Sequence, residues 1–144
     1  MKTADQLKPQ GIFKLNVWES GVLIEQYEDK NLIVDTGLNR IASLLGGLST
    51  DPVDEIGFGE GDAAPAAGDT DLTVGYVTKA FSAVALSGTG DVEFSFSLET
   101  SEGNGLAITE FGLFADGVLV SRKTRAAINK SSDIRLEGTW TIKF

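Results

Sequence analysis

The stretch from Ile108 to Arg122 constrains the fold more strongly than any other part of the chain. Asp116-Gly117 lies in its middle, between two short runs rich in large apolar residues. An Asp-Gly pair supplies the positive φ angles that a two-residue hairpin turn requires, and short apolar runs beside such a turn are typical of strands. Because turn chemistry and strand composition agree, the sequence predicts a β-hairpin over residues 108–122.

Alternation of apolar and polar residues predicts further strands. A period of two places every second side chain on one face, so an alternating run indicates a strand with one buried face. The clearest such run is residues 92–98, Val-Glu-Phe-Ser-Phe-Ser-Leu. Other strands are expected in an amino-terminal hairpin over 12–27, in short stretches near 31–34 and 56–58, as one or two strands within 72–86, and at 134–144, where Trp140, Ile142 and Phe144 share a face.

One short helix is predicted over about residues 36–45. Its apolar residues recur at helical spacing, Asp35 or Thr36 is expected to cap its amino end, and Gly46-Gly47 supplies a left-handed residue that can end it. A helix of about ten residues is marginal alone in water, so its apolar stripe must pack against a sheet.

These elements together predict a mainly β fold. Seven to nine short strands, with turn signals about every ten residues, and one helix favour a β-sandwich-like arrangement of two-layer antiparallel sheets. The length of 144 residues suits one domain, and no break in composition marks a linker. We therefore expect a single domain over residues 1–144.

The composition argues against several kinds of chemistry. The chain contains neither cysteine nor histidine, which excludes thiolate metal sites, cysteine nucleophiles and a Ser-His-Asp relay. The glycine-rich run at 57–61 lacks the spacing and the following Lys-Ser/Thr of a phosphate-binding loop. A pair of carboxylates acting on glycosides remains an alternative, because their separation depends on the fold. We predict a protein that is not an enzyme, with no catalytic residues and no cofactor.

Charge is unevenly distributed along the chain. Residues 1–118 hold six Lys/Arg and nineteen Asp/Glu, a net charge of -13, whereas residues 119–144 hold six and two, a net charge of +4. The basic segment either pairs internally with acidic strands or meets the acidic surface of a neighbouring copy head to tail. The residues that would make such partner contacts are Arg122, Lys123, Arg125, Lys130, Glu60, Asp62 and Asp69.

Residues 59–71 form a predicted long acidic loop. Its carboxylates, Glu60, Asp62, Asp69 and Asp71, are either a solvated surface or hard ligands for calcium, although their spacing does not match an EF-hand. Our prediction is that no metal is bound. Four aromatic residues, Trp18, Tyr27, Tyr76 and Trp140, are either packed in the core or exposed as a stacking surface for a sugar.

The remaining composition bears on location and partners. No apolar run approaches the roughly 20 residues that span a bilayer, so no membrane insertion is expected. The amino-terminal residues lack the apolar core of a signal peptide, which predicts synthesis in the cytoplasm. A net charge of -9 argues against nucleic-acid binding.

Four segments of the sequence resemble small structural proteins of tailed bacteriophages and prophages. They are residues 31–38, leading into the helix; 56–59, with Ala64-Pro65 and 69–72; 108–114, with Asp116-Gly117; and 136–144. The resemblance implies a tail, fibre or baseplate component of a virion, made in the bacterial host cytoplasm. It further implies a homo-oligomer, commonly a trimer, in contact with other virion tail proteins. The alternative is a carbohydrate-binding module that attaches the virion to a host surface glycan.

Overall fold

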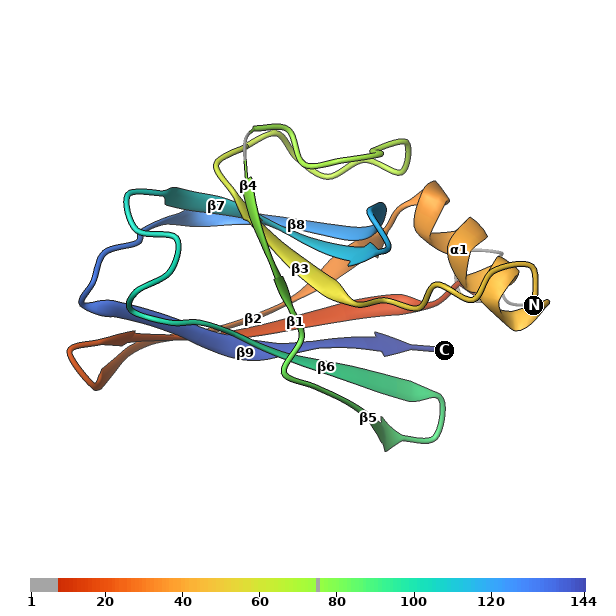
Figure 1. The fold of residues 1–144 in the computed structure, drawn as a ribbon, viewed down its shortest axis with the longest axis horizontal. Helices are drawn as coiled ribbons and strands as arrows, with labels where there is room; N and C mark the ends of the chain where they lie inside the picture. Colours follow the sequence, from red (N-terminus) through yellow and green to blue (C-terminus); the bar gives the residue numbers. More distant parts are fainter. Residues whose placement is uncertain (1–7, 75) are drawn as a thin grey trace.

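The computed structural model describes residues 8–74 and 76–144, which contain nine antiparallel strands and one helix. The elements are β1 Gln10–Glu19, β2 Val22–Ile33, α1 Asp35–Leu45, β3 Glu55–Gly59, β4 Tyr76–Ala80, β5 Ala83–Gly88, β6 Asp91–Leu98, β7 Ala107–Ala115, β8 Val118–Asn129 and β9 Ile134–Lys143. The strands form one sheet in the order β4-β3-β7-β8-β2-β1-β9-β6-β5. This sheet curls into a half-barrel, with α1 at one end (Figure 1).

Both predicted hairpins are confirmed, and their turns have the same chemistry. Asp116 and Gly117 have φ angles of 47° and 79° between β7 and β8, and Ser20 and Gly21 have 49° and 80° between β1 and β2. Positive φ at both central residues matches the natural twist of a hairpin. Each turn therefore brings its two flanking strands together as neighbours.

The expected two-layer sandwich is wrong, because a single strand joins the two halves of the structure. β2 is twelve residues long and pairs with β1 from Val22 to Asn31. Its last two residues, Leu32 and Ile33, pair instead with β8, so the sheet continues without a break. The mainly β class, the antiparallel pairing and the single short helix are confirmed. The stretch expected as a separate strand near 31–34 is the end of β2.

Aromatic side chains fill the concave side of the half-barrel. The ring of Phe13 on β1 lies 4.7 Å from that of Phe111 on β7 and 5.1 Å from that of Trp140 on β9. Phe58 on β3 contacts both Phe111 and Phe96, with ring centroids 5.8 and 6.1 Å apart. These rings connect strands that are distant in the sheet order, so burial of the apolar faces holds the curled shape.

One other predicted boundary needs correction, and the two-strand alternative for residues 72–86 is confirmed. Residues 123–130, which follow the predicted hairpin and were expected to form a connector, are mostly the second half of β8. The apolar stretch 72–86 breaks into β4 and β5, which lie at opposite ends of the sheet order although only Phe81 and Ser82 separate them. The predicted alternating strand at 92–98 is confirmed as β6, in which Phe94, Phe96 and Leu98 are buried.

The helix has the predicted extent but not the predicted cap. Its N-cap residue is Val34, with no side-chain hydrogen bond, and the hydroxyl of Thr36 donates instead to the carbonyl of Leu119 on β8 at 2.6 Å. Gly37 is buried against the same strand: a Cβ atom placed there would lie 2.2 Å from the carbonyl oxygen of Val120. The absence of a side chain at residue 37 therefore sets how closely α1 approaches β8.

We predict that Gly37→Ala destabilises the protein by about 1–3 kcal/mol, since overpacking forces the helix and β8 apart. Helix propensity alone predicts the opposite sign, because alanine is favoured over glycine by about 1 kcal/mol. Urea denaturation followed by circular dichroism measures the change. Gly46→Ala is the matched control, because its Cβ would have its nearest neighbour at 3.4 Å. A Gly37→Ala protein as stable as the wild type would contradict the close packing.

Candidate functional site

A buried carboxylate on β7 organises the long acidic loop. Glu110 is 0% exposed, and its oxygens accept hydrogen bonds from the backbone N–H groups of Gly61 (3.1 Å), Thr73 (3.1 Å) and Val74 (3.3 Å). Gly59 and Gly61 make room for it, since a Cβ atom at either position would lie 2.7 Å from a Glu110 oxygen. The glycine-rich run therefore accommodates an internal carboxylate.

The guanidinium of Arg122 balances this charge. Arg122, on the neighbouring strand β8, donates from Nε and Nη2 to Glu110 Oε2 at 3.1 and 2.9 Å. Its Nη1 donates to Asp69 in the loop at 3.1 Å. Arg122 is itself 0% exposed, so it is not available on the surface of this chain for the predicted partner contact. A buried charge pair is tolerable when both partners have further hydrogen bonds, as here.

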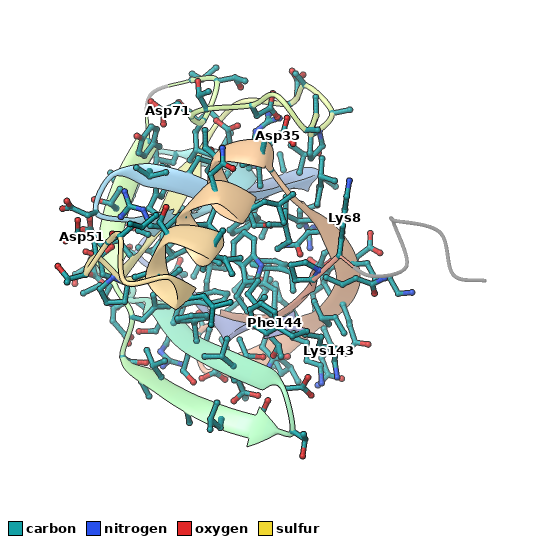
Figure 2. All side chains as sticks on the ribbon, turned by 90° about the vertical axis from the view of Figure 1, so that its right-hand side faces the viewer. Lys8, Asp35, Asp51, Asp71, Lys143 and Phe144 are labelled. Atoms are coloured by element: carbon teal, nitrogen blue, oxygen red, sulfur yellow. The ribbon has the colours of Figure 1, made fainter. Side chains whose placement is uncertain are left out.

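The loop is also tied to the helix. The backbone N–H of Asp35, the first residue of α1, donates to the carbonyl of Ala67 at 2.8 Å. Figure 2 shows Asp35 at the start of the helix, beneath the loop that carries Asp71. Asp71 accepts a hydrogen bond from the hydroxyl of Tyr76 at 2.8 Å. Burial of Tyr76, together with this carboxylate, raises the pKa of Tyr76 to about 12.

The other predicted contact residues of the basic segment have partners within the chain. Lys123 Nζ lies 2.6 Å from Asp29, and Arg125 forms a two-pronged pair with Glu25 at 2.8 and 3.2 Å. The hydrogen bond from Lys123 lowers the pKa of Asp29. Lys130 is buried, donates to Asn104 Oδ1 at 2.8 Å, and has its pKa lowered by burial. Internal pairing with acidic residues, one of the two predicted alternatives, is therefore confirmed for Lys123 and Arg125. Lys130 instead donates to neutral oxygens.

The three predicted acidic contact residues have different environments. Glu60 accepts a hydrogen bond from the backbone N–H of Ala107 at 3.0 Å, Asp69 binds Arg122, and Asp62 is exposed. Within residues 8–74 and 76–144, no group of three or more acidic, histidine or cysteine side chains could hold a metal ion. Contact of Glu60, Asp62 or Asp69 with a partner stays a prediction.

A cleft lined mainly by residues with polar side chains lies beside Trp18, at the end of the β1–β2 hairpin. It has a volume of about 410 Å³ and is lined by Trp18, Ser20, Gly21, Thr100, Ser132, Asp133 and Arg135. The indole N–H of Trp18 donates to Glu137 at 2.8 Å, and Arg135 bridges Glu137 and Glu99. The hydrogen bond from Arg135 lowers the pKa of both carboxyl groups. The Trp18 ring is thus held in place beside hydroxyl groups and a carboxylate.

The other aromatic residues of the predicted stacking surface have structural contacts. Trp140 is completely buried, as the core alternative requires. Tyr76 stacks on Phe114 with ring centroids 5.6 Å apart, and the Arg125 guanidinium lies 4.8 Å from the centre of the Tyr27 ring. Of the four, Trp18 lines the cleft described above, and Tyr27 lines a smaller one of about 260 Å³.

An apolar cleft of about 790 Å³ opens between α1 and the end of the sheet. Its lining is almost wholly apolar and comes from α1, β5, β6, β8, β9 and the last residue, including Leu44, Leu45, Val84, Val92 and Phe144. Figure 2 shows Phe144 between the helix and the β5–β6 hairpin. We refer to this feature as the apolar cleft.

Sequence reasoning missed the apolar cleft. Helical spacing puts Leu45 on the apolar stripe of the helix, and strand alternation puts Phe144 on the same face as Trp140, yet they are 91% and 68% exposed. Leu48 and Leu86 are exposed to a similar extent, 85% and 82%. A periodic pattern identifies which face is apolar but not whether anything covers it at the ends of an element. The only signal was the number of large apolar residues at element ends.

Comparisons with known proteins add no assignment: no family model, no curated protein and no solved structure matches the chain. Within the part of the chain that the structure describes, no helix is long and apolar enough to cross a membrane.

We predict that Glu110→Gln destabilises the protein by about 3–5 kcal/mol, because it removes the buried counter-charge of the Arg122 guanidinium and leaves only the partly exposed Asp69. The loop should loosen at the same time, so the amides of Gly61 and Thr73 should exchange faster with solvent. Urea denaturation and hydrogen exchange measure the two effects. Glu102→Gln is the control, since Glu102 and Lys79 are partly exposed and such pairs contribute about 1 kcal/mol or less. Equal effects of the two substitutions would contradict the organising role of Glu110.

Proposed function

We propose that this chain is a non-enzymatic structural protein of a phage or prophage virion that acts through self-assembly and contacts with neighbouring tail proteins. Its placement in a virion is supported by the sequence resemblance. The protein–protein role is supported by the apolar cleft and the exposed side chains around it. Single exposed apolar residues are ordinary on protein surfaces, but a contiguous apolar patch marks an interaction site.

The distribution of charge favours an apolar contact over an electrostatic one. Arg122, Lys123 and Arg125 all have carboxylate partners within the chain. A neighbouring copy would have to displace these partners before it could use the same cations. By contrast, Leu45 and Phe144 have apolar surface that remains in water. Covering it gains about 25 cal/mol for each Å² removed from solvent.

The shifted pKa values also fit a structural role. Four carboxyl groups have lowered pKa values, and the largest cause in each case is a hydrogen bond from a Lys or Arg side chain. They are Asp29, Glu99, Glu102 and Glu137. Lowering keeps these carboxylates ionised in salt bridges. A general acid near neutral pH needs the opposite shift.

We predict that the protein self-associates at high micromolar concentration and that the association persists at 1 M salt. Exposed charge pairs are screened beyond about 3 Å at that ionic strength, whereas apolar burial is not weakened. Size exclusion with light scattering measures the mass, for which the resemblance favours a trimer of 3 × 15.3 = 45.9 kDa. A monomer of 15.3 kDa at all salt concentrations would contradict self-assembly.

A second candidate function, glycan attachment, is favoured by the cleft beside Trp18. An aromatic ring held next to hydroxyl groups and a carboxylate suits a sugar, which presents an apolar ring face and polar edges. We predict that binding on a glycan array is lost in Trp18→Ala and kept in Tyr76→Ala. An array with no signal above background for the wild type would remove this candidate.

A further inference from the structure

The strand β5 is an edge of the sheet with unusual exposure. It is the last strand in the sheet order, paired only with β6, and all six of its residues are exposed. Its sequence, Ala-Val-Ala-Leu-Ser-Gly, contains no charged residue and no proline. An edge strand presents unpaired backbone N–H and C=O groups, so an uncharged one is a ready template for another strand.

The opposite edge of the sheet is protected in a way that β5 is not. β4 carries Lys79, whose ammonium lies 2.6 Å from Glu102 and 3.3 Å from the hydroxyl of Ser97. A lysine on an edge strand is one of the ordinary means of preventing strand addition. β5 does have an irregularity in its pairing, but it falls between Leu86 and Gly88 and leaves Ala83–Leu86 in regular register with β6.

The exposed face of β5 is continuous with the apolar cleft. Val84 lines the cleft, and Leu86, two residues further along the same strand, is on the same face of the sheet. Phe144 lies next to the turn of the β5–β6 hairpin, since its backbone N–H donates to the carbonyl of Gly90 at 3.0 Å. An added strand would therefore make backbone hydrogen bonds and cover apolar side chains together.

We propose that β5 pairs antiparallel with β5 of a second copy of this chain, which extends the sheet across a two-fold axis and covers the outer part of the apolar cleft. The inference rests on the proposed self-assembly and names its surface. The occupant must be an extended apolar strand without charge. β5 itself meets this requirement, and at a net charge of -9 two copies repel least where their contact strands are neutral.

Symmetry limits the register of this contact. Residues opposite each other in a sheet point to the same face, so in an antiparallel two-fold pair one residue must face its own copy. With Ala85 in that position, Val84 lies opposite Leu86 of the second copy, and the two largest side chains of each strand pair on one face. The small side chain of Ala85 lies on the axis. Such a contact gives an even number of copies: a dimer alone, or a hexamer if it combines with the threefold contact that the resemblance favours. A trimer of 45.9 kDa in solution would therefore overturn the β5 contact.

Single cysteines test the register, because the chain has no cysteine of its own. Ala85→Cys should form a disulfide-linked dimer on mild oxidation, seen on a non-reducing gel. Val84→Cys should crosslink at least about tenfold less, since diagonal neighbours are about 7–8 Å apart and disulfides need Cα atoms within about 7 Å. Val77→Cys, on the opposite edge strand, is the control for random collision. Equal crosslinking at residues 77 and 85 would overturn the proposal.

A charged residue introduced on β5 tests the same contact surface without crosslinking. Leu86→Glu should weaken self-association by at least about tenfold, because the carboxylate would be buried opposite an apolar residue. Val22→Glu adds the same charge at a residue 63% exposed on β2 and should leave the mass unchanged. Circular dichroism confirms that both variants fold. Light scattering with both variants then reports whether β5 makes the contact.

The outcomes separate this inference from the function on which it rests. An oligomer that Leu86→Glu does not weaken, and that Ala85→Cys does not crosslink, would overturn the β5 contact and leave self-assembly intact. A wild-type protein that stays monomeric and does not crosslink would overturn both. Crosslinking at residue 85, with loss of the oligomer in Leu86→Glu and not in Val22→Glu, would support both.

Discussion

The buried pair of Glu110 and Arg122 is the interaction on which the packing of β7, β8 and the long acidic loop depends. Two neighbouring strands each place one charged side chain out of water, and the two charges neutralise each other at 2.9 Å. The carboxylate still has lone pairs to satisfy, and the backbone of residues 61–74 supplies the donors. The Glu110 carboxylate thus holds the long loop in place, and the loop in turn supplies the hydrogen-bond donors that this buried carboxylate needs. Without the pair, neither the buried charge nor the loop conformation would be stable.

This arrangement explains where the molecule can and cannot make contacts. Arg122, Lys123 and Arg125, in the basic segment near the carboxyl end, form ion pairs with carboxylates on other elements of the same chain. These cations therefore stabilise contacts within the chain. The half-barrel is filled with aromatic rings in its middle but is less well covered near α1. At this end of the half-barrel lie the carboxyl ends of α1 and β9 and the uncharged edge strand β5. Among the described residues, apolar surface therefore gathers at this end of the half-barrel, around the apolar cleft.

The candidate sites were only partly predictable from the sequence. Charge counting found the basic segment and correctly included internal pairing as an alternative, but it could not tell that Arg122 would be buried. The spacing of the glycine-rich run excludes a phosphate-binding loop, but it does not indicate that Gly59 and Gly61 make room for the Glu110 carboxylate. Gly59 and Gly61 are 49 or more positions from Glu110 in the chain. Nothing in a local pattern specifies which distant side chain will face a given glycine.

The sequence by itself determined the two hairpins, the alternating strand β6, the extent of α1 and the mainly β class. Each follows from φ preferences and side-chain periodicity over a few neighbouring residues, which act before any tertiary contact exists. The tertiary structure alone decided that the strands form one curled sheet. The end of β2 pairs with β8 through two residues, a contact between segments some 90 positions apart. Such pairing depends on the burial of the whole core. Strand patterns in the sequence therefore do not tell whether the strands form one sheet or two.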